Sequence, residues 1–304
     1  MNRAARVAVA VAAVLAVGGA AAPVSADPTG PSDVHPALRG DLVAFYDFDH
    51  PVPGDPALER DQGRSGTEIE LINGGAGQRV ADRAYPGGRK VLQTGPKGGA
   101  DDDWKAGIWS ASGVRTLRAF NATEGATTMG WFKRDMDGPA AGFNAIGLTG
   151  VLTGDSDGHA VRALLELIDV NGTLRLVALG RRIDGGNSQT FAATEDWRTL
   201  LPKGEWVHLA ATFDFGHGTM ALYRNGQPVP GAYTRNDDPW LVNGPGPHVT
   251  TATDPRGIKI GGSFPWQGSA DRNPCDCRMD ALMFLGRSLS SREVANQYRF
   301  MIRG

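Results

Sequence analysis

Short runs of apolar residues, separated by turns rich in Gly, Pro, Asp and Asn, recur along most of this chain. The clearest example is Glu205 to Val229, EWVHLAATFDFGHGTMALYRNGQPV, with two apolar runs around a Gly-marked turn and a final Asn-Gly reversal. Apolar runs of this length between turn residues are typical of strands. Asn-Gly favours a tight hairpin because both residues tolerate positive φ. We therefore expect consecutive antiparallel strands over this segment.

The same pattern predicts strands elsewhere. Val170-Asn171-Gly172 joins two apolar runs and predicts a second hairpin. The other predicted strands are Leu42–Phe48, Thr127–Arg134, Arg162–Asp169, Thr173–Leu179, Ile258–Gly262 and Arg278–Phe284. Two stretches rich in Gly, Pro and Asp, residues 95–125 and 234–256, are expected to be long loops in which specificity resides. The sequence has no repeat of about 20 to 50 residues, which excludes a solenoid.

One helix is predicted, near the C-terminus. Ser290 and Glu293 have the spacing of a capping box, in which two side chains satisfy free N–H groups at the start of a helix. Leu289 and Val294 are placed as the accompanying hydrophobic staple. A short helix should therefore follow the last strand.

Two segments together resemble a known family. The hairpin of Glu205–Val229 and the strand with capped helix of Cys277–Tyr298 resemble the laminin G-like branch of the concanavalin A-like lectin and glucanase jelly rolls. Leu42–Phe48 resembles the opening strand of that family, and Trp131 occupies a strand that usually has a buried Trp. The resemblance implies an all-β fold, a two-sheet antiparallel jelly-roll sandwich with a short C-terminal helix.

The beginning of the chain predicts export from the cell. Residues 1–26 combine two early Arg residues, an apolar run and the small residues Val24-Ser25-Ala26, the three regions of a secretory signal peptide. An uncleaved anchor is disfavoured because the Ala- and Gly-rich run is weakly apolar. Residues 27–40 are expected to be a flexible lead-in, and residues 41–304 to form one laminin G-like domain. The mature protein is predicted to be secreted and extracellular, without membrane insertion.

The net charge of the chain limits the classes of binding partner. The full chain has 31 Lys and Arg against 33 Asp and Glu. Signal cleavage would remove two Arg and no acid, leaving 29 basic residues and a net charge of −4. Because the sequence also lacks a Lys/Arg cluster, nucleic acid and anionic membrane surfaces are disfavoured as partners.

The two cysteines, Cys275 and Cys277, are separated by one residue. Outside the cell this favours a disulfide, although so small a loop leaves little chain entropy to remove. A metal site is the alternative, but two thiolates do not complete a tetrahedral zinc shell and no His lies nearby at ligand spacing.

Asp280 is the first candidate functional residue. Alternation along its strand puts it on the same face as Leu282 and Phe284, and a carboxylate beside the core needs a metal, an Arg or backbone donors as its partner. Asp47 is placed similarly in the first strand. The resemblance implies that the first and last strands are neighbours, so Asp47 and Asp280 are a candidate Ca²⁺ site. The alternatives are loop caps or Arg pairs, and a weaker calcium candidate is Gly154–Gly158, GDSDG.

Two tryptophans point to a sugar ligand. Trp240 in NDDPWLVNG and Trp266 in GSFPWQGSADRN lie among polar residues, and aromatic faces stack on the apolar faces of sugar rings. Asn243 and Asp271 in the same segments are candidate partners for sugar hydroxyls. The alternative is that these tryptophans close the edges of the sandwich.

A local catalytic signature is missing from the sequence. Family 16 glycosidases of this fold have Glu-x-Asp-x-Glu, whereas Glu166 and Asp169 here are three apart, on opposite strand faces. We therefore interpret Glu166 as an ordinary exposed strand residue and His208 as structural. The sequence predicts a lectin-like glycan-binding protein with a structural Ca²⁺. The alternatives are a glycoside hydrolase or polysaccharide lyase with a non-local site, and a module that binds a cell-envelope protein.

Overall fold

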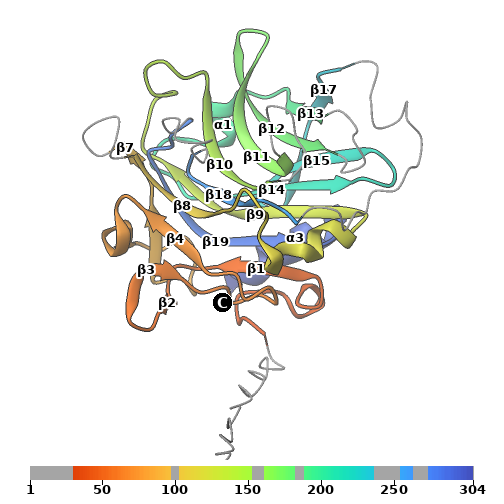
Figure 1. Ribbon diagram of the computed structural model, residues 1–304. Coiled ribbons are helices and arrows are strands. Elements are labelled where there is room, and N and C mark those ends of the chain that lie inside the picture. The colour runs from red at the N-terminus through yellow and green to blue at the C-terminus, as the bar shows by residue number, and fades with distance from the viewer. Residues whose placement is uncertain are drawn as a thin grey trace, which may run out of the picture.

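The computed structural model describes residues 30–96, 103–152, 161–181, 188–235, 254–262 and 273–303. Most of these residues form antiparallel strands arranged in two sheets (Figure 1). The predicted signal segment, residues 1–26, lies outside the described residues.

The first sheet contains both the first and the last strand of the described chain. Its order is β16-β15-β14-β9-β19-β6-β5, and β1 also pairs with β19. The strands of this sheet are β1 (Leu42–Tyr46), β5 (Arg79–Ala81), β6 (Lys90–Gln93), β9 (Gly125–Arg134), β14 (Val207–Asp214), β15 (Thr219–Arg224), β16 (Gln227–Val229) and β19 (Cys277–Leu285).

The second sheet packs against the first. Its order is β17-β13-β12-β11-β10-β18-β8-β4-β3-β2, and β7 pairs with β8. The strands of this sheet are β2 (Pro51–Val52), β3 (Asp55–Glu59), β4 (Ile69–Ile72), β7 (Gly95–Pro96), β8 (Asp103–Trp109), β10 (Ala145–Leu152), β11 (Val161–Val170), β12 (Thr173–Arg181), β13 (Ser188–Ala193), β17 (Gly231–Tyr233) and β18 (Gly257–Ile260).

The described part of the chain also has five helices before, between and after the strands. They are η1 (Pro36–Leu38), η2 (Gly75–Gln78), η3 (Arg115–Ala122), α1 (Trp197–Leu200) and α3 (Ser291–Arg303). Within the described part of the chain, none of the helices has the length and apolar character needed to cross a bilayer.

Strand alternation sorts the apolar residues into three layers. The main core lies between the sheets and includes Leu165 of β11 and Phe213 of β14. A second cluster covers the outer face of the first sheet, where Met129 and Trp131 lie with Val294 of α3. A third, smaller cluster lies on the outer face of the second sheet. Each fully buried side chain of this size contributes about 1.5–3 kcal/mol.

The sequence-based fold prediction is confirmed. Asn171 and Asn225 both adopt positive φ, 54° and 49°, at the tips of the two predicted hairpins. Trp131 is only 5% exposed, as expected of a core residue. One prediction is wrong: residues 95–125 are not one long loop, because they contain β7, β8 and η3. Strand β8 pairs with β4 and β18, which lie far from it in sequence.

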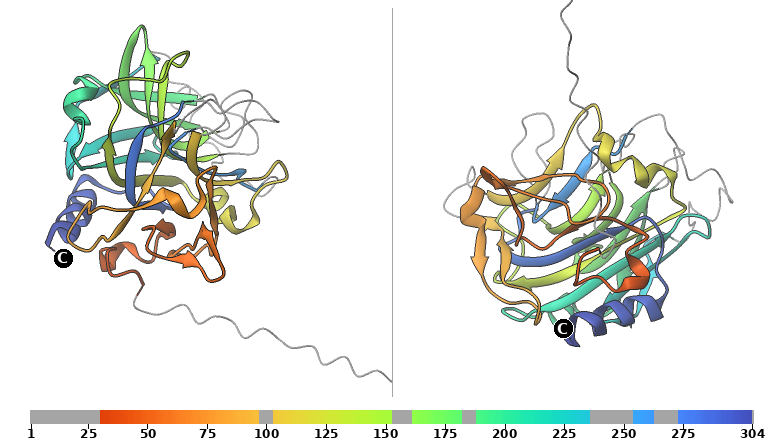
Figure 2. Two further views of the ribbon diagram at one scale, coloured as in Figure 1. Left: turned by 90° about the vertical axis from the view of Figure 1, so that its left-hand side faces the viewer. Right: turned by 90° about the horizontal axis from the view of Figure 1, so that it is seen from below.

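The capping box at α3 is also confirmed. Ser290 donates from its N–H and its hydroxyl to Glu293 Oε2, at 2.9 and 2.8 Å. Leu289 and Val294 are both buried in the cluster beneath the helix. Figure 2 shows α3 lying across the outer face of the first sheet, on the same side as the first described residues.

The residues before β1 pack against α3. Val34 and Leu38 are buried in the outer cluster of the first sheet. Gln297 of α3 accepts the N–H of His35 at 2.7 Å and donates to the carbonyl of Asp33 at 2.8 Å. The packed chain therefore begins earlier than the boundary expected at Asp41, because η1 supplies apolar side chains that the surrounding Pro, Gly and Asp obscure in the sequence.

The predicted disulfide between Cys275 and Cys277 is present and buried. The two Cα atoms are 5.2 Å apart. Thr94 holds this segment, since its N–H donates to the carbonyl of Cys277 at 2.8 Å and its hydroxyl donates to that of Cys275 at 2.7 Å. The disulfide therefore lies where β6 meets the beginning of β19.

Candidate functional site

A β-bulge in β19 determines where Asp280 lies. Asp280 is paired with Trp131 of β9, the register shifts directly after it, and Ala281 has a φ of 47°. Opposed residues of two strands share a face, so Asp280 lies with Trp131 on the outer face of the first sheet. Leu282 and Phe284 belong to the core between the sheets. The predicted shared face of these three residues is wrong, because the bulge interrupts the alternation.

Asp280 is a buried carboxylate with one unmatched oxygen. Its side chain is 0% exposed, and Oδ1 accepts the N–H of Ala281 at 2.7 Å. Oδ2 has no hydrogen-bond partner among the described residues. Burial raises the pKa of Asp280 well above its usual range, and the negative charges of Asp47, Asp49 and Asp33 raise it further. The ionised form is therefore costly unless a cation compensates it.

The neighbourhood of the first and last strands is confirmed. Strand β1 pairs with β19, and Tyr46 lies opposite Leu282. Asp47 follows Tyr46 directly, so it lies at the same end of the strand pair as Asp280. Whether the two carboxylates share an ion stays a prediction.

The turn from Tyr85 to Gly88 covers Asp280. The N–H of Gly88 donates to the carbonyl of Tyr85 at 3.1 Å, and the Tyr85 hydroxyl donates to Asp33 Oδ2 at 2.9 Å. A Cβ on Gly88 would stand 2.8 Å from Asp280 Oδ2, and one on Gly87 would stand 2.8 Å from Asp33 Oδ1. Only glycine lets the backbone approach both carboxylates so closely.

An acidic pocket of about 370 Å³ lies beside this turn. Burial raises the pKa of Asp49, and the charge of Asp47 raises it further. Carboxylate and other oxygens are the ligands that Ca²⁺ prefers, so this donor set fits that ion. The residues that line the pocket are Pro31, Ser32, Asp33, Asp47, Asp49, His50, Gln62, Gly87 and Arg89.

A hydrogen-bonded chain holds Asp47 at this pocket. His50 Nδ1 lies 2.8 Å from Asp47 Oδ1, and this bond raises the pKa of His50. The N–H of His50 donates to Glu59 Oε1 at 3.0 Å, and Arg79 Nη2 lies 2.6 Å from Glu59 Oε2. Asp47, His50 and Glu59 bring potential metal-ligand atoms within 4.8 Å of one another. Because Arg79 already neutralises Glu59, we interpret this trio as a support for Asp47.

Glu166 lies on the outer face of the second sheet and is buried. It is 2% exposed, with Oε2 at 2.7 Å from Lys259 Nζ and Oε1 accepting from Asn273 Nδ2 at 3.0 Å. The expectation of an exposed residue is wrong. The alternation of side chains along β11 correctly places Glu166 on the face away from the core. It does not reveal that Glu166 pairs with Lys259 of β18.

A pocket of about 580 Å³ lies over β4 and β8 at the edge of the same sheet. Trp109 is half-buried there, and Glu68 and Glu70 are exposed. Glu70 lies opposite Gly107 of β8, whose missing side chain leaves room between the strands. The lining residues of this Trp109 pocket are Leu58, Gly66, Thr67, Glu68, Glu70, Ile72, Gly107, Ile108, Trp109 and Thr116. Sequence reasoning missed it, although the alternation of Glu68-Ile69-Glu70 was a usable signal.

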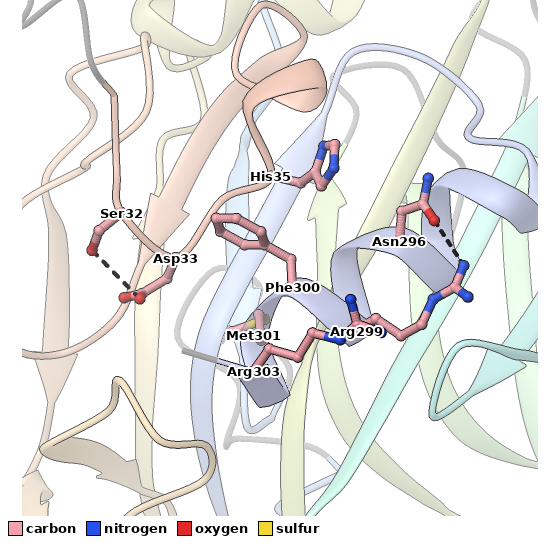
Figure 3. A pocket seen from close by; sticks show the side chains of 8 residues that line it. All are labelled: Ser32, Asp33, His35, Asn296, Arg299, Phe300, Met301 and Arg303. Atoms are coloured by element: carbon pink, nitrogen blue, oxygen red, sulfur yellow. Dashed lines mark hydrogen bonds between the residues drawn. The ribbon is translucent and has the colours of Figure 1, made fainter.

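A third pocket, of about 520 Å³, lies between the first described residues and α3 (Figure 3). The His35 ring meets Phe300 edge-on, with centroids 5.5 Å apart. Arg299 donates to Asn296 Oδ1 at 2.7 Å. The residues that line this pocket are Ser32, Asp33, His35, Asn296, Arg299, Phe300, Met301 and Arg303. Two guanidinium groups and one carboxylate make it opposite in charge to the other two pockets.

The predicted sugar-binding residues Trp240, Asn243, Trp266 and Asp271 lie outside the described residues. The weaker calcium candidate, Gly154–Gly158, also lies outside the described residues. These assignments stay predictions.

Solved structures with a similar fold include the Trypanosoma rangeli sialidase in complex with 2,3-difluorosialic acid, at a TM-score of 0.50 and 15% identity. The match covers 87% of this chain and 33% of the sialidase. The binding domain of botulinum neurotoxin DC in complex with rat synaptotagmin II matches at a TM-score of 0.55 and 10% identity, over 87% of this chain and 52% of that one. This chain thus spans about a third to a half of these proteins.

A structure of botulinum neurotoxin type C, described as entering cells through two ganglioside molecules, matches at a TM-score of 0.56 and 10% identity, with 87% and 52% covered. Comparison with curated protein sequences gives no match. Residues 110–295, more than half of the chain, match the family described as the Concanavalin A-like lectin/glucanases superfamily. The match agrees with the two antiparallel sheets and the helix that follows them. This chain therefore belongs to the concanavalin A-like lectin/glucanases superfamily.

Proposed function

We propose that this protein is a secreted carbohydrate-binding protein whose native state holds a calcium ion. The observation that supports sugar binding best is the Trp109 pocket, where a half-buried indole lies beside exposed polar groups. An aromatic face with a few polar groups around it is the arrangement that a sugar ring needs.

Two solved structures with a similar fold concern proteins that interact with glycans, which is compatible with this proposal. The sialidase structure contains a sialic acid derivative, and the neurotoxin structure concerns gangliosides. At 10 to 15% identity these likenesses support the fold alone, so the choice of sugar has to come from the residues of this chain.

The calcium proposal rests on the unmatched Oδ2 of Asp280. Asp280 and Asp47 would hold the ion. Asp47 lines the acidic pocket together with Asp33 and Asp49, and the charges of these three residues act on the neighbouring Asp280. Bound calcium would supply the positive charge that a buried carboxylate lacks. The backbone at Gly88 lies close to Asp280, whose side chain is 0% exposed, and so it keeps water from that carboxylate.

Thermal melting of the mature protein with calcium and with a chelator tests the ion. Anything that binds only the folded state raises stability, by about 2.7 kcal/mol at a hundredfold excess over Kd. We expect Asp280→Asn to melt at or above the chelated wild type, because a buried charge is removed, and to lose the calcium response. Asp137→Asn, at a side chain that is 88% exposed and paired with Lys203, is the control that keeps it. An Asp280→Asn variant with the full calcium response would refute this site.

The same melting experiment with a panel of soluble polysaccharides tests the sugar. A shift with one glycan supports binding, and release of reducing or unsaturated sugar from that glycan would instead indicate a hydrolase or lyase. If no glycan shifts the melting temperature while an envelope protein is retained by the immobilised chain, the adhesion alternative is supported. Neither nucleic acid nor a membrane surface is proposed as a partner.

A further inference from the structure

The outer face of α3 presents a row of basic side chains, the arginine stripe, formed by Arg292, Asn296, Arg299 and Arg303. The three arginines are exposed and Asn296 is half-buried. Positions at i, i+4, i+7 and i+11 lie on one face of a helix, and at 1.5 Å per residue the stripe is about 16 Å long. Because the arginines are separated in the sequence, only the helix brings them into one row.

The arginines of the stripe have no acidic partner within the described part of the chain. Arg292 and Arg303 form no hydrogen bond or ion pair there. Arg299 donates from Nε to the carbonyl of Ala295 at 3.2 Å and from Nη2 to Asn296 Oδ1 at 2.7 Å. Both acceptors are uncharged, so they orient this guanidinium group without neutralising it. The partial negative charge at the end of a helix is confined to its last turn, where Arg303 offsets it.

Two carboxylates lie near the stripe, and neither compensates it. Glu293 is the only acidic residue of α3, and it is already bonded to Arg287 at 2.7 Å. Asp33 lines the pocket of Figure 3 with Arg299. The guanidinium group of Arg299 extends towards Asn296 and away from Asp33 (Figure 3). The face therefore keeps a net positive charge.

The pocket of about 520 Å³ shown in Figure 3 continues the stripe, because Arg299 and Arg303 line it. His35 Nδ1 accepts the N–H of Ala37 at 3.3 Å, so in the neutral ring the other nitrogen carries the hydrogen and can donate it. Phe300 adds apolar surface. Cationic groups, a neutral donor and an aromatic ring together suit a sugar that bears a carboxylate.

We infer that the arginine stripe and the pocket beside it bind an acidic polysaccharide whose sugars carry carboxylates, such as a chain of uronic acids. The inference rests on the proposed sugar-binding function and adds a second surface to it, on the opposite face of the sandwich from the Trp109 pocket. A guanidinium group binds a carboxylate through two parallel hydrogen bonds. Successive carboxylates of the polysaccharide contact successive arginines, and the row of like charges attracts the chain from a distance.

Isothermal titration of the mature protein with oligogalacturonate at low salt tests the inference. Its methyl ester is the matched ligand, since the ester keeps every sugar ring and removes the negative charges. We expect oligogalacturonate to bind about tenfold more tightly than the ester, because several exposed ion pairs of modest strength add up. Raising the salt concentration to about 0.5 M should remove most of this difference, since exposed charges are screened.

Variants of exposed arginines locate the surface. Arg299→Gln with Arg303→Gln should weaken binding of oligogalacturonate about tenfold and leave binding of the ester unchanged. Arg292→Gln should weaken oligogalacturonate by a smaller factor. The matched control is Arg60→Gln with Arg115→Gln, two exposed arginines outside the stripe. This control removes the same charge and should bind as the wild type does. All these side chains are exposed, so each variant should melt as the wild type does.

The outcomes separate this inference from the function on which it rests. Equal affinity for oligogalacturonate and its ester, or an equal loss in the control and in the stripe variant, overturns the acidic-polysaccharide surface. A neutral glycan that still binds in that case leaves the proposed sugar-binding function standing. Stripe-dependent binding of duplex DNA or of phosphatidylglycerol vesicles as tight as that of oligogalacturonate overturns the choice of a polysaccharide. Failure of every glycan, neutral or acidic, to bind refutes both the surface and the sugar-binding function.

Discussion

His208 shows what a single buried residue contributes. It lies in β14 with 0% exposure, and neither ring nitrogen has a hydrogen-bond partner among the described residues. Its ring meets Trp131 edge-on, with centroids 5.4 Å apart. Burial lowers the pKa of His208 to about 3. This buried, unpaired environment agrees with the interpretation from the sequence that His208 is a structural residue.

Acid should therefore destabilise the protein through His208. The unfolded chain binds a proton at a pKa of about 6.5, whereas the folded chain does so only near 3. Stability from this group is present above pH 6.5 and is lost as pH falls towards 3, by roughly 2 kcal/mol between pH 7 and 4.5. Urea unfolding at both pH values should show this difference for the wild type. His208→Phe should show a smaller loss, and an identical pH dependence in both proteins would contradict this assignment.

The ion pair between Glu166 and Lys259 gives a second residue-level prediction. Lys259→Met would leave a buried carboxylate without its cation, which costs about 3–5 kcal/mol. Adding Glu166→Gln to that variant should restore part of the loss, because the unpaired charge is removed. Chemical denaturation of the two single variants and the double variant measures the coupling. Additive losses would mean that the pair contributes little as a pair.

At single positions, the alternation of apolar and polar residues predicts burial well, but it predicts less well on which face of the sheet a side chain lies. Trp131 was correctly assigned to a buried strand position. Asp280 was assigned to the wrong face because the left-handed conformation of Ala281 carries no sequence signal comparable to glycine. The partner of Glu166 is Lys259, 93 residues away in sequence, and a single sequence does not specify such a pairing.

At the level of elements, the capped helix α3 is held by a network that its own sequence supplies. Arg287 Nη2 lies 2.7 Å from Glu293 Oε1, and the Ser290 hydroxyl donates to Glu293 Oε2. Arg287 and Ser290 lower the pKa of Glu293 to about 2, despite partial burial. Glu293→Ala should reduce the free energy of unfolding by about 1 kcal/mol, since the group is partly exposed and its ion pair is screened.

The pH dependence distinguishes this contribution from that of His208. Because its folded pKa is depressed, Glu293 stabilises the protein above its unfolded pKa of about 4.3 and loses that effect as pH falls towards 2. The difference between wild type and Glu293→Ala should therefore shrink below pH 4. Unfolding by urea at pH 7 and pH 3 is the measurement. A difference that stays constant would mean that Glu293 acts through packing and not through its charge.

Elements with strong local signals were predictable, and those formed by distant pairing were not. The Asn-Gly hairpins and the capping box are determined by adjacent residues, so the sequence identifies them directly. Strand β8 begins in a run of Asp and depends on β4 and β18 for its pairing. The composition of residues 95–125 predicts a loop there, and so it indicates no role for Trp109. The candidate pocket was missed for the same reason.

At the scale of the whole molecule, the residues before β1 connect three parts of the fold. Gln297 joins His35 to α3, Tyr85 joins Asp33 to the turn over Asp280, and Leu38 packs beneath the helix. These contacts span the beginning, an early loop and the end of the folded chain. The sequence suggested only a flexible lead-in there, since local composition does not report long-range packing.

A truncation series tests this role. A chain beginning at Gly30 should match the mature protein, whereas one beginning at Asp41 should lose the packing of Val34 and Leu38 and the two bonds to Gln297. At about 1.5–3 kcal/mol for each buried apolar side chain, the loss should reach about 3–6 kcal/mol. Protease digestion should then cut α3 sooner, because its outer contacts are gone, and the calcium response should weaken with the loss of Asp33. If the chain that begins at Asp41 has the same melting temperature as the longer chain, the residues before β1 do not stabilise the sandwich. The acidic pocket would then have to bind its ion without them.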